Sequence, residues 1–315
     1  MPKHSKIGRI MLKYSPEGTN NALVKKFENR SQLKEAMKNS EIVEGKVLLC
    51  DKDRNLHIDL GVCRGVIPYR EGALGIQEGS VRDIALISKV NKYVCFKIIG
   101  FHKTQSGERI AVLSRRIVQL ECMKNYIDKL TEGDIIEAKV THLEAFGAFI
   151  DIGCGINSLI PIDMLSVSRI SNPNQRVYAG QIIRTVLKKR EAEKLTFSLK
   201  ELLGTWEENA ALFSQYETVG GIVRSVESYG VFIELMPNLA GLAELDCSLR
   251  EGQSVSVFIK SIIPEKMKIK LAVVEAFDDC EQTPELVYFE KGKHISSWQY
   301  SPEGAVKVVR SEFGG

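Results

Sequence analysis

The fold is decided by a stretch that the chain contains twice, first as Ala138-Lys-Val-Thr-His-Leu-Glu-Ala-Phe-Gly-Ala-Phe-Ile-Asp-Ile152 and again as Gly221-Ile-Val-Arg-Ser-Val-Glu-Ser-Tyr-Gly-Val-Phe-Ile-Glu-Leu235. The two copies align at a constant offset and without a gap. They share a valine near the start, the central glycine and the aromatic residue that follows it by two positions. Such self-similarity indicates two copies of one structural unit.

A fainter third copy lies upstream at 45–61, where Ile58-Asp59-Leu60-Gly61 matches Ile150-Asp151-Ile152-Gly153. Each copy continues into a short apolar run and a variable segment. A strand pattern that opens on Gly-x-x-Val/Ile follows at 81–87, 181–187 and 253–259, and a basic strand such as 194–200 ends the unit. Short alternating strands between Gly, Asn or Pro turns predict a small all-β barrel. Apolar residues at helical spacing predict helices within 21–40, 118–130 and 205–213.

The composition fits a folded protein and excludes a polycation. Hydrophobic residues make up 44% of the chain, and 43 Lys+Arg stand against 40 Asp+Glu, so any nucleic-acid site must be a local patch. The cysteines are scattered, without a Cys-x-x-Cys pair. We therefore expect reduced, mostly buried thiols and no zinc.

Nothing in the sequence indicates a membrane or a catalytic centre. Met1–Ser15 is basic but lacks the apolar core of a signal peptide, and no window approaches the roughly 18 apolar residues that span a bilayer. No phosphate-binding loop, nucleophile elbow or metal cluster is recognisable. We expect a soluble, cytoplasmic protein that is not an enzyme and needs no cofactor or metal. Tyr-Ser-Pro-Glu-Gly occurs at both 14–18 and 300–304, and only shared turn chemistry offers an explanation.

Side-chain parity on the repeated strand predicts where its aromatic residue points. Side chains alternate between the faces of a strand, so Ala148, Ile150 and Ile152 share one face and Phe149 shares the other with Asp151. Because an unpaired carboxylate does not sit in a barrel core, we expect the Asp151 face to be wet and Phe149 to stand in solvent.

The later copy repeats this parity with Phe232 beside Glu234. Phe146 and Tyr229 precede glycines, where flat ligands can approach. Two outward aromatic residues per barrel would form a platform for bases, each stacked base contributing about 1–3 kcal/mol. An aromatic residue on a strand is more often part of the core, and packing against a neighbouring barrel is a third interpretation. The repetition favours the platform.

Basic residues on neighbouring strands would contact phosphates, and binding should weaken as salt rises. The candidates are Lys139, Arg184, Lys188, Lys189, Arg190 and Lys194 in the second barrel and Arg224, Lys260, Lys266, Lys268 and Lys270 in the third. The third barrel carries more acidic residues, so we expect it to bind more weakly. Arg54 and His57 stand at the aromatic positions of the first barrel and are weaker candidates, because that barrel could instead dock on a protein.

These motifs resemble the S1 RNA-binding domain, a five-stranded OB-fold barrel. The resemblance is strong for 132–200, good for 217–273 and weak for 41–116, and the whole order resembles a short three-barrel ribosomal-S1-like protein of Gram-positive, clostridial-type bacteria. It implies that Phe146, Phe149, Tyr229 and Phe232 contact RNA. The family's histidine, aspartate and arginine do not carry over, because Pro161, Arg190 and Lys194 occupy their positions in the second barrel, and Pro264 and Lys268 those of the pair in the third. The resemblance thus implies a basic site that follows phosphates.

The predicted fold is mostly β, with three tandem OB-fold (S1-type) five-stranded barrels joined by short helical linkers. The expected parts are an N-terminal segment with a helix (1–40), a divergent barrel (41–116), a helical linker (117–130), the barrel with the main RNA site (131–203), a second helical linker (204–215), a third barrel (216–275) and a partly ordered tail (276–315). We predict non-catalytic binding of single-stranded RNA or mRNA in translation, with the small ribosomal subunit. The alternatives are an accessory RNA-binding protein of an RNA-decay, transcription or regulatory complex, and a protein-docking scaffold.

Overall fold

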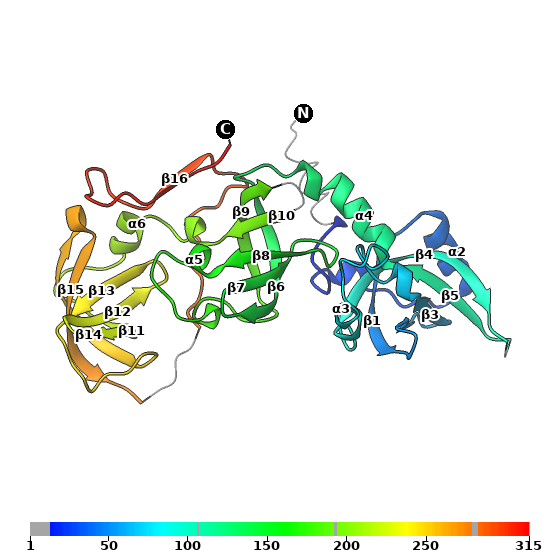
Figure 1. The fold of residues 1–315 in the computed structure, drawn as a ribbon, viewed down its shortest axis with the longest axis horizontal. Coiled ribbons are helices and arrows are strands. Elements are labelled where there is room, and N and C mark those ends of the chain that lie inside the picture. Colours follow the sequence, from blue (N-terminus) through cyan, green and yellow to red (C-terminus); the bar gives the residue numbers. More distant parts are fainter. Residues whose placement is uncertain (1–12, 106, 192–193, 279–282, 315) are drawn as a thin grey trace. The chain divides into compact units, whose positions relative to one another are not determined.

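The computed structural model describes residues 13–105, 107–191, 194–278 and 283–314, and within them it contains three closed five-stranded barrels (Figure 1). The predicted fold, mostly β with three tandem OB barrels joined by short helical segments, is confirmed. The chain divides into two compact units. The first comprises residues 1–130 and 151–157, and the second comprises residues 131–150 and 158–315.

The barrels share one strand order. The first strand pairs with the second and the fourth, and the third strand lies between the second and the fifth, to which it runs parallel. The first barrel contains β1 (Val43–Cys50), β2 (Leu56–Asp59), β3 (Arg64–Ile67), β4 (Tyr93–Lys103) and β5 (Arg109–Ser114). The second contains β6 (Ile135–Glu144), β7 (Gly147–Asp151), β8 (Asn157–Pro161), β9 (Ile182–Glu191) and β10 (Lys194–Ser198). The third contains β11 (Thr218–Glu227), β12 (Gly230–Met236), β13 (Leu239–Ala243), β14 (Ser254–Ile263) and β15 (Lys268–Ala276).

Helices flank the barrels, and side chains cap the first turns of the three longest helices that the structure describes. Asn29 caps α2 (Arg30–Lys38), Ser114 caps α4 (Arg115–Asn125), and Thr205 forms a capping box with Glu208 at α6 (Trp206–Ala210). The remaining short helices are η1 (Asn21–Leu23), η2 (Tyr69–Glu71), α3 (Ile84–Ile87), η3 (Ile127–Lys129), α5 (Ile162–Leu165), η4 (Pro173–Gln175), η5 (Lys200–Leu202) and η6 (Pro264–Lys266). Among the described residues, none of the helices combines the length and the apolar character that a membrane crossing requires.

The prediction of which side chains of the repeated strand point into the barrel is confirmed in all three barrels. The buried side chains are Leu56, Ile58 and Leu60 in the first, Ala148, Ile150 and Ile152 in the second, and Val231 and Ile233 in the third. Leu235, expected inward, is only half-buried. The strand predicted at 81–87 is wrong, because Ile84–Ile87 forms α3 and the strand begins at Tyr93. A short apolar run does not distinguish a strand from a helical turn.

The six cysteines that the structure describes are free, and Cys280 lies outside the described residues, as do residues 1–12. Cys95, Cys122 and Cys154 are buried, Cys50 and Cys63 are half-buried, and Cys247 is exposed. Within the described ranges, no three His, Cys, Asp or Glu side chains are grouped so that they could hold a metal ion.

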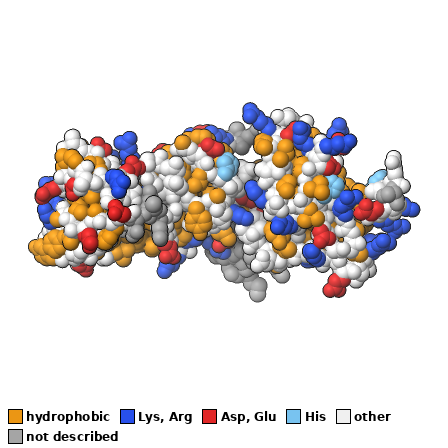
Figure 2. Space-filling view, turned by 90° about the horizontal axis from the view of Figure 1, so that it is seen from below, with side chains coloured by type: hydrophobic (Ala, Val, Ile, Leu, Met, Phe, Trp, Pro, Cys, Tyr) orange, Lys and Arg blue, Asp and Glu red, His pale blue; other side chains and the backbone are white. Residues whose placement is uncertain are grey.

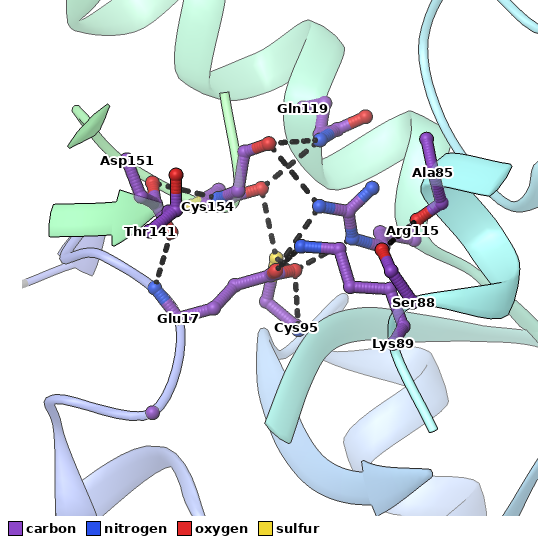
Figure 3. Close-up of polar contacts among 12 residues, drawn as sticks. Glu17, Ala85, Ser88, Lys89, Cys95, Arg115, Gln119, Thr141, Asp151 and Cys154 are labelled. Atoms are coloured by element: carbon purple, nitrogen blue, oxygen red, sulfur yellow. Dashed lines mark hydrogen bonds and ion pairs between the residues drawn. The ribbon is translucent and has the colours of Figure 1, made fainter. Parts of the chain in front are cut away.

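Asp151 does not face solvent as predicted, because it belongs to a buried polar cluster of the first unit (Figure 3). Its side chain is 2% exposed and accepts hydrogen bonds from the backbone N–H groups of Gly153 (2.9 Å), Gly155 (3.0 Å) and Glu17 (2.8 Å). The carboxylate is therefore satisfied by the turn that follows β7. The rule that a carboxylate avoids the interior holds only for an unpaired one.

Glu17 is the centre of this cluster. Its carboxylate accepts from the Arg115 guanidinium at 2.6 and 3.0 Å and from Lys89 Nζ at 3.0 Å. Burial alone would raise the pKa of Glu17, but these two cations hold it well below its usual range. Burial and the nearby Glu17 charge act in the opposite sense on Asp151 and raise its pKa to about 6.

The raised pKa of Asp151 predicts how the stability of the first unit depends on pH. Between about pH 4 and pH 6 the folded state binds more protons at this carboxyl than the unfolded state does, so the free energy of unfolding should fall as pH rises through that window. At about 1.4 kcal/mol per pKa unit, the decline amounts to at most about 3 kcal/mol. Asp151→Asn should remove it. Hydrogen exchange of the α4 amides from pH 4.5 to 7 measures the decline, and an identical decline in the variant would contradict this assignment.

The two Tyr-Ser-Pro-Glu-Gly segments occupy similar places. In the first unit, the Cys154 N–H donates to the Ser15 carbonyl at 3.0 Å. In the second unit, the Tyr300 hydroxyl donates to the Asn238 carbonyl. Cys154 and Asn238 both have positive φ and both lie in the turn between the second and third strands of a barrel. Each copy therefore contacts the same turn of its barrel, with different groups.

The C-terminal segment 283–314 is an integral part of the second unit. It contains β16 (Ser297–Gln299) paired with β17 (Arg310–Glu312), and it buries Ile295 and Phe313 against the second barrel. The Ile135 N–H donates to the Lys293 carbonyl, and the Ile295 N–H to the Gly133 carbonyl, both at 2.9 Å. The described part of the segment expected as a tail thus packs on the second barrel through buried apolar side chains.

Candidate nucleic-acid interface

An aromatic cluster stands on the outer surface of the second barrel. Phe146 precedes β7 and is 55% exposed, and its ring meets the half-buried Phe149 edge-on at a centroid distance of 5.9 Å and an interplanar angle of 81°. The ring of His142, on β6, stacks on Phe149 at 4.3 Å and 7°. Phe149 is thus covered on one side by an imidazole, and Phe146 offers the open ring on which a base can stack.

His142 is a candidate that sequence reasoning missed. Its counterpart in the third barrel is Ser225, which is opposite Phe232 on the neighbouring strand. The repeat therefore places His142 opposite Phe149. This cross-strand position was readable from the aligned copies, because residues opposite each other on one face are in contact.

The third barrel repeats the geometry. Tyr229 is 67% exposed and meets the half-buried Phe232 at 6.1 Å and 87°. The next residues across the outer surface follow from the register, in which Phe232 is opposite Leu242 and Leu242 is opposite Lys270. Leu242 and Lys270 are both exposed, so this platform continues into an apolar and then a cationic position.

The glycines beside the aromatic residues have a structural cause. A Cβ on Gly147 would lie 2.3 Å from the Ile160 carbonyl oxygen, and one on Gly230 would lie 2.5 Å from that of Ala243. The neighbouring strand, rather than an approaching ligand, therefore requires glycine at these positions. The glycine also sets Phe146 and Tyr229 at the turn, where they protrude.

Two of the predicted cations of the second barrel are held by the chain itself. The Arg184 guanidinium donates to the carbonyls of Glu290 and Gly292, and Lys188 lies 3.5 Å from a Glu201 oxygen and 4.6 Å from the centroid of the Phe313 ring. The C-terminal segment therefore covers the side of β9 on which these two predicted phosphate contacts lie.

The other candidates of this barrel lie nearer its surface. Lys194 is exposed at the start of β10, Lys189 is exposed and ion-paired with Glu191, and Lys139 and Arg190 are half-buried on β6 and β9. Thr196 of β10 is opposite both Leu159 of β8 and Lys189 of β9. By the repeat, Leu159 stands beside Phe149 as Leu242 stands beside Phe232. This row therefore leads from the aromatic cluster toward the cationic end of β9 and β10.

Arg224, a predicted phosphate contact of the third barrel, is also held within the protein. It is buried and its guanidinium donates to Glu234 at 2.9 and 3.0 Å, and the buried Arg176 donates to the same carboxylate. Glu234, 2% exposed, was expected on the wet face, and its two arginine partners explain its burial. Lys266, Lys268 and Lys270 are exposed, and Lys260 is ion-paired with Glu244 at 2.8 Å.

The first barrel carries neither aromatic residue of the platform. Arg54 is ion-paired with Asp83, and His57 Nε2 lies 2.9 Å from an Asp51 oxygen. Both weaker candidates are thus engaged with carboxylates of their own barrel.

Over the surface drawn in Figure 2, basic and acidic side chains are interspersed and form no uniformly positive face.

Residues 129–200 match the protein family described as S1 RNA binding domain. The strands of the second barrel, β6 to β10, all lie within this match. A small ribosomal subunit protein bS1 from Staphylococcus aureus (strain COL) is 29% identical over 261 residues, which are 77% of this chain and 64% of that protein. A small ribosomal subunit protein bS1 homolog from Bacillus cereus (strain ATCC 10987 / NRS 248) is 27% identical over 263 residues, 78% of this chain and 66% of that protein.

The chain therefore spans slightly less than two thirds of the length of these curated relatives. Among solved structures, a multidomain protein with nucleic acid binding domains from Streptococcus pneumoniae is 13% identical and has a TM-score of 0.25, with coverage of 75% of this chain and 74% of that one. The residues that match the S1 RNA binding domain family, 129–200, include the aromatic cluster of His142, Phe146 and Phe149.

Proposed function

We propose that this chain is a cytoplasmic protein that binds single-stranded RNA through its second and third barrels and catalyses no reaction. The observation that carries the proposal is the same pair of rings, perpendicular and partly exposed, at matching positions of two sister barrels. Exposed rings accept the faces of unpaired bases without regard to sequence. Duplex RNA offers no such faces, because its bases are stacked within the helix.

The cations support the same proposal. Lys194 and Lys189 in the second barrel and Lys268 and Lys270 in the third are exposed on strands that adjoin the platforms. Because Arg184, Lys188 and Arg224 are engaged within the protein, each barrel offers only a few phosphate contacts. We therefore expect a modest dependence of affinity on salt.

We further propose that the RNA is mRNA and that the chain acts in translation. The support is the naming of its relatives as small ribosomal subunit proteins bS1. The competing role is that of an accessory RNA-binding protein in an RNA-decay, transcription or regulatory complex.

Fluorescence anisotropy across a salt series tests the binding. We expect an unstructured RNA to bind, an RNA duplex of the same length to bind much more weakly, and log Kd to rise linearly with log salt. Equal affinity for both forms, or no binding at low salt, would refute the stacking site. Sedimentation with purified small subunits then separates the two roles. Cosedimentation that disappears when mRNA is removed would argue against a ribosomal site.

A further inference from the structure

The fourth strands of the second and third barrels present equivalent surfaces. Gly133 N–H donates to the Leu187 carbonyl and Leu187 N–H to that of Asp134, both at 2.9 Å. The third barrel has the same pair of hydrogen bonds, from Tyr216 to Ile259 at 2.9 Å and from Ile259 to Glu217 at 2.8 Å. The register agrees, because Ile135 is opposite Val186 and Thr218 is opposite Phe258. The outward row Arg184, Val186 and Lys188 of β9 therefore corresponds to Ser256, Phe258 and Lys260 of β14.

In the second barrel an extended segment of the chain covers this surface. Ile295 and Phe313 pack on Ile135 and Val186, all of them buried. The backbone takes part as well, through the hydrogen bonds that join Ile135 to Lys293 and Ile295 to Gly133. The segment thus binds by apolar contact and by strand-like hydrogen bonds together, which is how a peptide adds to the edge of a sheet.

The first barrel has its own cover on the outer side of β4. Lys97, nearly buried there, is ion-paired with Glu121 of α4, and Cys95 N–H donates to Glu17 at 3.2 Å. In both barrels, therefore, a segment from outside the barrel protects the outer side of the fourth strand from solvent.

In the third barrel the described residues leave this surface open. Tyr216 is 71% exposed and Thr218 is exposed, whereas their counterparts Gly133 and Ile135 are buried. Phe258 is half-buried, and its ring lies 6.3 Å from that of Tyr216. Two aromatic side chains stand where the second barrel has a covered glycine and valine, and exposed apolar surface of this kind marks an interaction site.

We propose that the surface formed by Tyr216, Thr218 and Phe258 binds an extended peptide of the kind that covers the second barrel. The occupant would place a large aliphatic residue on Phe258, as Ile295 lies on Val186. It would place an aromatic residue beside Lys260, as Phe313 lies beside Lys188. Its backbone would add to the start of β11. This site is independent of the proposed RNA binding.

RNA is the less suitable occupant for two reasons. The aromatic platform is on β12 and Phe258 is on β14, with β11 between them in the closed barrel. On β11, Phe232 is opposite Ser225 whereas Phe258 is opposite Thr218, so the two surfaces lie about 23 Å apart along this strand. The cation nearest the new surface, Lys260, is engaged by Glu244. The backbone frame, by contrast, is the same as the one that holds a peptide segment in the second barrel.

A fluorescein-labelled peptide with the sequence of residues 288–314, which contains both Ile295 and Phe313, tests the proposal, with the full-length chain as its partner. We expect saturable binding that weakens about 10-fold or more in Tyr216→Asp and in Phe258→Ala, as for a residue central to an interface. Tyr216→Asp changes a mostly exposed side chain, so the fold should persist, and circular dichroism confirms it. Leu212→Asp, at an exposed site outside the surface, and a peptide of scrambled sequence are the controls.

Three outcomes would overturn the proposal. They are no saturable binding, equal binding of the scrambled peptide, and binding that Tyr216→Asp leaves unchanged. The last outcome would mean that the peptide only exchanges with the C-terminal segment on the second barrel. Single-stranded RNA is the further probe. Its affinity should be the same for wild type and Tyr216→Asp, and a loss as large as that caused by platform variants would assign the surface to RNA.

Discussion

Replacing Arg115 by methionine should destabilise the first unit by about 3–5 kcal/mol, the usual cost of leaving one partner of a buried ion pair alone. Glu17 is buried and receives two hydrogen bonds from this guanidinium, which also donates to the carbonyls of Gly72 and Gly155. Lys89 alone would then face a carboxylate that is cut off from water. The repulsion between the carboxylates of Glu17 and Asp151 would then be opposed by Lys89 alone.

Hydrogen exchange of the α4 amides measures the stability of the first unit, because α4 belongs to it. Tryptophan fluorescence would not, because Trp206 and Trp298 both belong to the second unit. Lys124→Met is the matched control, because it removes an exposed cation from the same helix, and it should change stability by less than about 0.5 kcal/mol. The double variant Glu17→Gln/Arg115→Met should recover part of the loss, because neither charge then remains buried alone. A loss below about 1 kcal/mol in Arg115→Met would show that Lys89 suffices.

Replacing both Phe146 and Phe149 by alanine should weaken the binding of single-stranded RNA by roughly 30-fold or more. Loss of two stacked bases at about 1–3 kcal/mol each sets this scale. His142 stacks on Phe149 alone and cannot replace the exposed face of Phe146. The slope of log Kd against log salt should stay as in wild type, because no cation is removed.

Anisotropy with a short unstructured RNA measures this effect. Tyr178→Ala is the control for a lost exposed ring, since Tyr178 is as exposed as Phe146 but lies in the loop before β9. Phe146→Ala by itself, which changes only the exposed ring, guards against a folding defect from the half-buried Phe149. Wild-type affinity in the double variant would show that the rings are not the binding surface.

The fold could be predicted because its signals are local. Alternation of side chains along a strand follows from backbone geometry, so the apolar residues 148, 150 and 152 had to share a face, and the gap-free repeat extended that result to the third barrel. The error at 81–87 arose where this signal is weakest, in a four-residue apolar run that formed α3. Phe146 and Tyr229 are exposed, but Phe149, which was expected to stand in solvent, is half-buried, and the reason given for that expectation, a wet Asp151, was wrong.

The fate of the charged residues could not be predicted in this way. Whether a cation is available to a phosphate depends on which distant group comes within a few ångströms of it, and Arg184 meets carbonyls 106 and 108 positions away. Glu17 and Arg115 are 98 positions apart, and Arg224 and Glu234 lie on different strands. The sequence by itself therefore determined the barrels and their aromatic platforms, because backbone periodicity and apolar burial are set within each repeat. Only the tertiary structure decided which charges are buried, which surface of each barrel is covered and which remains open, because those outcomes depend on contacts between segments far apart in the chain.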